Sequence, residues 1–135
     1  MIDLPGRHLP ADHSAGDEST LGGYMIVHAR PAAFDGADGM PYSVDIVVDD
    51  TEREAQRFGA YLLFMKWRRI GPPGIDGHLE TEYLTFADTA DAARDAIGAM
   101  SLHEAKAHLD ALVQQRAGDG GRRWFDAMRD EGDDA

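Results

Sequence analysis

Residues 58–67 read FGAYLLFMKW, and this stretch decides the fold because it is apolar on both faces of a strand. Successive side chains of a strand point to opposite faces. Ala60, Leu62 and Phe64 therefore share one face. The other face carries Tyr61, Leu63, Met65 and Trp67. A strand that is apolar on both sides is typical of the middle of a sheet that is covered twice.

Each face of this strand needs a cover, because a large exposed apolar patch is unusual on a monomer. Helices of the same chain are expected to cover one face. For the other face two covers remain open. Either the C-terminal segment with Trp124 and Phe125 folds back over it, or a second copy of the chain does.

Three more strands are expected around this one, separated by residues that favour turns. The sequence GYMIVHAR at 23–30 is the first. The second, YSVDIVVDD at 42–50, alternates in the manner of a half-buried strand, and HLETEYLTF at 78–86 is the last. Because the connections are short and contain no crossover helix, the pattern predicts an antiparallel meander.

The hydrophobic period changes to that of a helix after residue 86. Asp88 and Asp91 are expected to cap a helix over 89–99. Ser101 and Glu104 form a capping box that begins a second helix, which is expected to end near Arg116. Its buried stripe should consist of Leu102, Ala105, Leu109, Leu112 and Val113.

The predicted fold class is therefore α+β, with a four-stranded antiparallel meander followed by two C-terminal helices packed on one face. Residues 1–20 are poor in aliphatic side chains and are expected to form a flexible tail. Residues 21–117 form the single domain. Residues 118–135 begin with the glycine-rich GDGG and end in an acidic tail, with a short third helix expected at 122–130.

Composition excludes several classes of function. The chain has 135 residues, 13 basic and 25 acidic, and a net charge of −12, which opposes direct binding to nucleic acid. It has no cysteine, so thiol chemistry and cysteine-bound metals are excluded. No signal peptide is recognisable, and the longest apolar run is too short to cross a bilayer. We expect a soluble cytoplasmic protein that does not insert into membranes.

Strand parity is expected to gather several polar side chains on one face of the sheet: His28, Arg30, Asp45, Glu80 and Glu82. A carboxylate beside a histidine can serve general acid–base catalysis. The simpler interpretation is an ordinary solvated face. No serine lies in a G-x-S-x-G context, so no catalytic residue is assigned and an enzymatic function is disfavoured.

The loop WRRIGPPGIDGH at 67–78 concentrates basic and aromatic residues in an acidic chain. Arg68 and Arg69, beside glycine-rich backbone, are candidates for binding a small anion. Trp67 and the arginines are also residue types enriched at protein interfaces. The alternative is a hairpin tip whose glycines and prolines serve the turn.

The histidines do not predict a metal site. In HEAKAH at 103–108 the two histidines are five residues apart, whereas a zinc-binding helix needs them four apart. No cofactor and no metal is therefore expected.

The passage YLTFADTADAARDAIGAM at 83–100 resembles the sheet-to-helix junction of HicB-type antitoxins, where a strand leads through a threonine into an Ala-rich helix. The Pro-Asp-x-Pro-Gly turn of that family and a C-terminal DNA-binding element are missing. The resemblance implies an antitoxin-like protein as one alternative.

These observations favour a small, acidic, non-catalytic protein that acts through protein–protein contacts, as an accessory, regulatory or immunity-type subunit that forms a homodimer or binds another protein. The alternatives are a small-molecule or anion binder, a hydrolase-like enzyme, and an acidic mimic of nucleic acid. Candidate contact residues for a ligand or partner are Trp67, Arg68, Arg69, His78, His28, Asp45 and Glu80.

Overall fold

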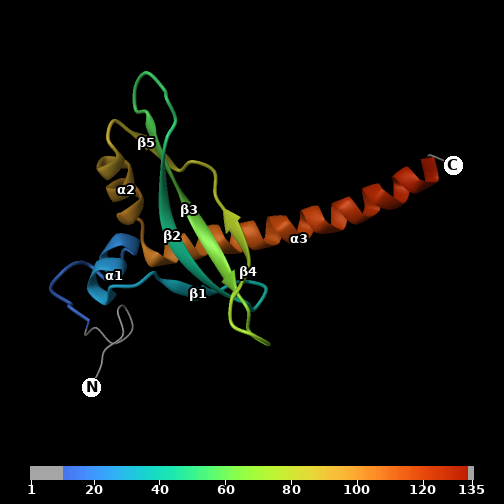
Figure 1. Ribbon diagram of the computed structural model, residues 1–135, viewed down its shortest axis with the longest axis horizontal. Coiled ribbons are helices and arrows are strands. Elements are labelled where there is room, and N and C mark those ends of the chain that lie inside the picture. Colours follow the sequence, from blue (N-terminus) through green and yellow to red (C-terminus); the bar gives the residue numbers. More distant parts are fainter. Residues whose placement is uncertain (1–10, 134–135) are drawn as a thin grey trace.

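The computed structural model describes the backbone of residues 11–133, with side chains as far as residue 117. It is an α+β fold in which helices cover one face of an antiparallel sheet (Figure 1). The elements are α1 (Leu21–His28), β1 (Ala33–Asp35), β2 (Pro41–Asp50), β3 (Phe58–Trp67), β4 (Ile75–Glu80), β5 (Thr85–Ala87), α2 (Ala90–Gly98) and α3 (Leu102–Asp133).

The central strand is β3, as its apolar sequence predicts. Strands β1 to β4 form a meander in the order β1-β2-β3-β4, and β5 pairs with β3 along the same edge as β4. All of these pairs are antiparallel. The predicted four-stranded meander and α+β class are therefore confirmed, with a short fifth strand in addition.

The core lies between the helices and one face of β2 and β3. Leu62 and Phe64 are fully buried, and the helices add Leu21, Ile97 and Leu109 to the same cluster. The remaining buried members are Ala32, Tyr42, Val44, Ile46, Ala60, Ala93 and Ala105. As expected, helices cover one of the two apolar faces of β3.

The prediction of a strand at 23–30 is wrong, because residues 23–28 belong to α1 and Ala29 is its C-cap. Tyr, Ile and Val favour strands, but a cap and tertiary packing override that preference. The Thr20 hydroxyl accepts a hydrogen bond from the Gly23 amide at 3.1 Å and caps the helix. A Cβ on Gly22 would lie only 3.1 Å from Gly98 Cα, so the glycines let α1 and α2 approach closely.

The strand predicted at 78–86 is interrupted between β4 and β5. The Thr81 hydroxyl replaces a backbone carbonyl and accepts from the Leu62 amide at 3.0 Å. The Leu84 amide then donates to the Ala60 carbonyl at 2.8 Å. The interruption changes the side-chain parity, so that Tyr83 lies on the same face as Glu80 instead of opposite it.

The helix predicted at 89–99 is confirmed as α2, but its cap is Thr89. The Thr89 hydroxyl accepts from the Ala92 amide at 3.1 Å, whereas Asp88 accepts from the Gln56 amide at 2.9 Å. Of the two hydrogen bonds of the capping box expected at α3, the structure gives the one in which the Ser101 hydroxyl accepts from the Glu104 amide at 3.0 Å.

Helix α3 does not end near Arg116 but continues to Asp133, and it includes the residues predicted as a separate helix at 122–130. Glycine within a helix costs only about 1 kcal/mol relative to alanine, so GDGG weakens the helix without ending it. Figure 1 shows that the last turns of α3 project away from the sheet.

Replacing Leu62 by alanine should lower the free energy of unfolding by about 3 kcal/mol, because it leaves a cavity in the core. The matched control is Leu63→Ala, on the face that the helices do not cover, which should cost about 1 kcal/mol. Urea denaturation at low protein concentration measures both. Equal losses would contradict the assignment of the two faces.

Candidate functional site

The face of the sheet opposite the helices carries the odd-numbered side chains of β3. We call this surface the open face, defined by Tyr61, Leu63, Met65 and Trp67 together with their neighbours on β2, β4 and β5. In the part of the chain that the structure describes, none of these four side chains packs on the hydrophobic core. The Trp67 side chain is 39% exposed, and the other three are half-buried. Among the residues whose side chains the structure describes, no helix covers the open face.

Carboxylates flank this apolar strip at its centre. Leu63 is paired with Asp45 on β2 and with Glu80 on β4, so the leucine lies between two exposed acidic side chains. Met65 is paired in the same way with Ser43 and His78. Directly opposed side chains in antiparallel strands lie about 5 Å apart. The centre of the open face therefore presents apolar groups between negative charges.

Aromatic side chains cover the other end of the open face. The ring centroid of Tyr83 lies 5.8 Å from that of Tyr61 and 5.4 Å from that of Phe86. The Arg53 guanidinium lies 4.0 Å from the Phe86 centroid. A Cβ on Gly59 would come within 2.7 Å of the Tyr83 ring, so glycine is required beneath this ring.

A hydrogen bond joins this aromatic cluster to β2. The Tyr83 hydroxyl donates to Asp49 Oδ2 at 2.8 Å. That hydrogen bond is the main reason why the pKa of Tyr83 is raised, because removing the proton would place two negative charges side by side. The contact fixes the ring while leaving 41% of the residue exposed.

Each of the two arginines of the basic loop lies near a carboxylate. Arg68 Nε lies 3.9 Å from Asp76 Oδ1, and Arg69 Nη2 lies 3.7 Å from Asp35 Oδ1. Trp67 turns toward β2, where its Nε1 donates to the Ser43 hydroxyl at 2.9 Å. Gly71, Gly74 and Gly77 all have positive φ. These contacts favour the hairpin-tip interpretation of 67–78, with Trp67 at the edge of the open face.

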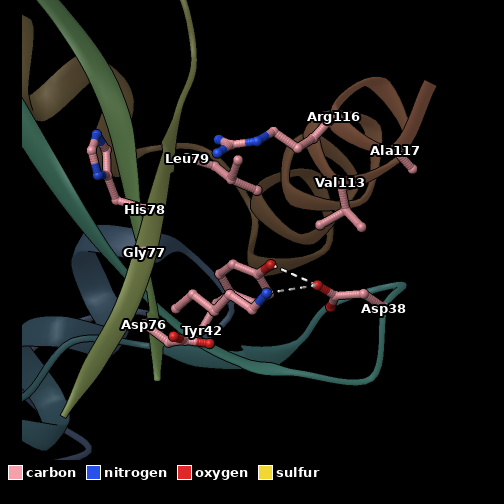
Figure 2. Close-up of a pocket in the computed structure, with 10 residues that line it drawn as sticks. Asp38, Tyr42, Asp76, Gly77, His78, Leu79, Val113, Arg116 and Ala117 are labelled. Carbon is pink, nitrogen blue, oxygen red and sulfur yellow. Dashed lines mark hydrogen bonds and ion pairs between the residues drawn. The ribbon is translucent and has the colours of Figure 1, made fainter. Parts of the chain in front are cut away.

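A pocket of about 240 Å³ lies between β4, the beginning of β2 and α3 (Figure 2). Tyr42 donates from its hydroxyl to Asp38 Oδ2 at 2.8 Å, and Lys66 Nζ lies 3.9 Å from the same oxygen. Burial of Tyr42, and then its contact with Asp38, raise the pKa of the phenol, which stays protonated. Ligand pockets usually exceed about 300 Å³, so this one is small for a ligand site.

Among the predicted contact residues, Asp45, Glu80, His78 and Trp67 lie on or at the edge of the open face. Figure 2 shows the His78 ring on the other side of β4 from Tyr42 and Arg116. The expected gathering of His28 and Arg30 with Asp45 and Glu80 is wrong, because α1 replaces the strand that would have aligned them.

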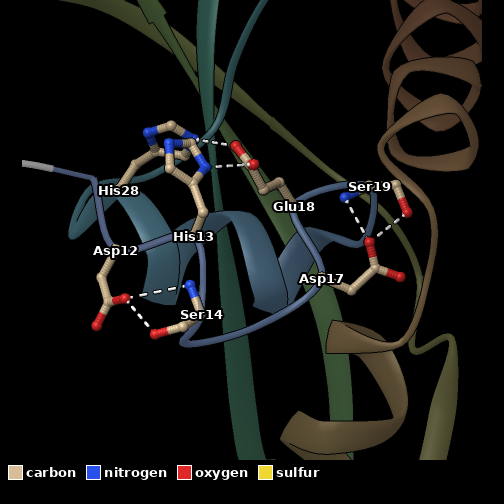
Figure 3. A network of polar contacts seen from close by, with 7 residues as sticks. All are labelled: Asp12, His13, Ser14, Asp17, Glu18, Ser19 and His28. Carbon is tan, nitrogen blue, oxygen red and sulfur yellow. Dashed lines mark hydrogen bonds and ion pairs between the residues drawn. The ribbon is translucent and has the colours of Figure 1, made fainter.

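His28 instead holds the segment that precedes α1 (Figure 3). Its Nε2 lies 2.8 Å from Glu18 Oε1, and His13 Nδ1 lies 2.5 Å from Glu18 Oε2. The Asp12 amide also donates to the Val27 carbonyl at 2.9 Å. The side chains of Asp12 and Asp17 accept from Ser14 and Ser19, respectively. This cluster therefore ties residues 12–19 to α1.

The cluster does not provide a metal site. Within the described residues, no group of three or more His, Asp or Glu side chains is placed to hold a metal ion. The same search covers His103 and His108 in α3, which were already too far apart in sequence for a zinc-binding helix.

Reasoning from the sequence missed several residues that shape these surfaces. Gly59, Tyr83 and Phe86 meet only because the strand after Glu80 is interrupted, and no spacing rule signals that event. Asp38, Lys66 and Arg116 come together from separate elements. The alternation of Tyr42 with Val44 and Ile46 was the one available signal, since it placed Tyr42 on the inner face.

Glu18→Gln should reduce the stability of the protein near neutral pH. It should also make the stability change less as the pH falls into the acidic range. Hydrogen bonds to His13 first, and then to His28, lower the pKa of Glu18 in the folded state. The stabilisation is therefore present above the ordinary glutamate pKa of about 4.3 and is lost as pH falls through the lower folded value.

Melting temperatures of the parent and the variant between neutral pH and pH about 3 measure this effect. The two should converge at the acid end, and the exposed Glu54→Gln serves as control. A difference between parent and Glu18→Gln that stayed constant over this range would contradict the assignment.

Gly59→Ala should displace the Tyr83 ring, because the added methyl group occupies its place. The hydroxyl then loses Asp49, and the pKa of Tyr83 falls toward the ordinary tyrosine value of about 10. A tyrosine titration by NMR, assigned with Tyr83→Phe, measures the change. Asp49→Asn should lower the same pKa without steric displacement. An unchanged Tyr83 titration in both variants would refute this contact.

Among the described residues, no helix is both long enough and apolar enough to cross a membrane. Comparison with known proteins gave no match, since no family model fits the chain and no curated protein or solved structure is significantly similar to it. The candidate function therefore rests on the geometry of the open face.

Proposed function

We propose that this protein is a non-catalytic accessory, regulatory or immunity-type subunit that acts through protein–protein contacts and self-associates through the open face. The single observation that carries this proposal is that β3 is apolar on both faces while, within the described part of the chain, helices cover only the Leu62 face. Burying an apolar surface stabilises a complex by about 25 cal/mol for each Å² removed from water. The uncovered face therefore favours association.

The chemistry of the open face suits a protein partner. Tyr, Trp and Met are enriched at protein interfaces, and Tyr61, Met65 and Trp67 occupy successive positions along this face of β3. The flanking carboxylates of Asp45 and Glu80 form a polar rim. Apolar centres with charged rims combine affinity with selection of the partner by charge.

Self-association is supported by the path of α3. The helix packs on the core through Ala105 and Leu109, and its last turns then leave the sheet (Figure 1). A C-terminal segment that continues away from the sheet does not cover the open face of its own chain. Of the two covers considered for the second face of β3, a second copy is the one consistent with this path.

The serines support a role without catalysis, because each of the four is occupied in a structural contact. Ser14 and Ser19 donate to Asp12 and Asp17, and Ser101 caps α3. Ser43 accepts from Trp67. A serine nucleophile needs a base within hydrogen-bonding distance, and these contacts are not with histidine.

The open face does not favour the nucleic-acid mimic. Such a mimic needs carboxylates in continuous rows, so that they imitate successive phosphates. Asp45 and Glu80 are instead separated by Leu63. The observed alternation of apolar and acidic groups fits a protein surface better.

Leu63→Asp should raise the dissociation constant for self-association about 30-fold or more, because it places a charge in the apolar centre of the interface. Sedimentation velocity from low micromolar to submillimolar protein measures this constant. Ile26→Asp is the matched control, because Ile26 is an apolar side chain of α1 that is 63% exposed. A full chain that remained monomeric throughout, or a Leu63→Asp variant that associated as the parent does, would contradict the proposal.

A further inference from the structure

Strand β2 is paired along only part of its outer edge. The short strand β1 pairs with residues 41–43, whereas β2 continues to Asp50. Within the described residues, no other strand pairs with β2 on that side. We call this side of residues 45–50 the outer edge. We propose that the outer edge binds an extended segment of a partner protein as an added antiparallel strand, with one side chain of that segment in an adjacent pocket.

The backbone groups of the outer edge point away from the sheet. The Val44 amide donates to the Ala32 carbonyl at 3.0 Å, on the β1 side of β2. Alternate residues of an antiparallel strand direct their amides and carbonyls to the same edge. The backbone groups of Ile46 and Val48 therefore also face away from β3. An unpaired strand edge of this kind is a template for pairing with another chain.

A side chain takes the place of the missing strand at Ile46. Asp45 Oδ1 accepts from the Ile46 amide at 2.8 Å, although the two residues are adjacent in the sequence. Asp45 is exposed, so its carboxylate can turn to solvent when a backbone carbonyl of another chain approaches. The incoming carbonyl then replaces one hydrogen bond by another and leaves no donor unsatisfied.

A pocket of about 380 Å³ lies between α1, α2 and β2, within the size range of ligand sites. The apolar and small residues that line it include Met25, Ile26, Ile46, Gly98 and Ala99. Figure 1 shows both helices on the β2 side of the sheet, away from β4. In an added antiparallel strand, the residue opposite Ile46 has its side chain on the same face, about 5 Å away. That side chain therefore meets the pocket.

The charges of the outer edge define the segment that fits. Asp45 and Asp49 lie at alternate positions on the open-face side of β2, and basic side chains opposite them are favourable. The pocket carries one charge of each sign, Arg94 and Asp95, and adds no net preference. In strand addition, main-chain hydrogen bonds supply affinity, and pockets for alternate side chains supply specificity. The partner segment therefore alternates basic with apolar residues.

The same charges disfavour a second copy of this chain at the outer edge. Residues 45–50 include Asp45, Asp49 and Asp50. Among the described residues, only Asp50 of these three has an ion-pair partner, Arg57 at 2.6 Å. Pairing the outer edge with its own copy would bring like charges together on neighbouring strands, which is destabilising. The inference is therefore independent of self-association through the open face.

Titration of the full chain with the peptide acetyl-TKVTLK-amide tests the inference. Paired antiparallel with residues 45–50, this peptide places its leucine opposite Ile46 and its two lysines opposite Asp45 and Asp49. The Val48 amide should exchange rapidly with solvent in the free protein and about 10-fold or more slowly with saturating peptide, as measured by NMR. The Val47 amide, which faces β3, is the internal reference and should exchange slowly in both states.

Modified peptides test the hydrogen bonds and the charges. N-methylation of the leucine removes an amide hydrogen that faces β2 and should weaken binding about 10-fold or more. N-methylation of the threonine before it is the matched control, because that amide faces away from β2. A peptide with glutamate in place of both lysines should also bind about 10-fold more weakly.

A pair of substitutions in α2 tests the pocket. Ala99→Phe fills the pocket and should weaken peptide binding about 10-fold or more. Ala96→Phe is the matched control and should bind as the parent does, because Ala96 is also exposed but does not line the pocket. Circular dichroism confirms that both variants retain their fold.

The inference is overturned by no binding up to about 1 mM peptide, by equal affinity of the two N-methylated peptides, or by unchanged binding to Ala99→Phe. Shifts of Leu63 and Met65 without shifts of Ile46 and Val48 would also overturn it, because they would place the peptide on the open face. Sedimentation velocity measures self-association separately, so the failure of either proposal is distinguishable from the failure of the other.

Discussion

The structure depends on the burial of one face of β3. This strand is paired along both edges, with β2 on one side and with β4 and β5 on the other, so its register is held in place. A slip of one residue would exchange its two faces. Because Leu62 and Phe64 lie under the helices, Leu63 and Met65 must lie on the open face. The strand that forms the core therefore also forms the candidate interface.

Charge limits what the open face can bind. Asp45 and Glu80 border Leu63, and Asp49 anchors the Tyr83 ring at the aromatic end. Like charges oppose a partner with an acidic surface, whereas a surface with basic groups beside apolar side chains is favoured. For the proposed protein contact, the acidity of the chain, which first served to disfavour nucleic acid, is expected to favour partners with basic groups.

Much of the fold follows from local periodicity, and the errors have physical causes. The strand at 58–67 was predicted from a continuous apolar run between turn-forming residues, and the helix after Thr89 was predicted from apolar residues that repeat with a helical period. The α1 segment was mistaken for a strand because its consecutive apolar residues have no clear period, and the Thr20 cap decides its form. Asp45 and Glu80 were predicted to share one face of the sheet, and they do. His28 was predicted on the same face because the sequence alone did not show that its segment forms a helix instead of a strand.

The most direct test of the interaction surface is methyl NMR of the full chain over a range of concentrations. The signals of Leu63 and Met65 should shift as the concentration rises, because these side chains enter the interface. The signals of Leu62 and Leu109, which are buried beneath the helices, should stay in place. If Leu63 and Met65 were unchanged at every concentration, the open face would not mediate self-association, and the central claim would be contradicted.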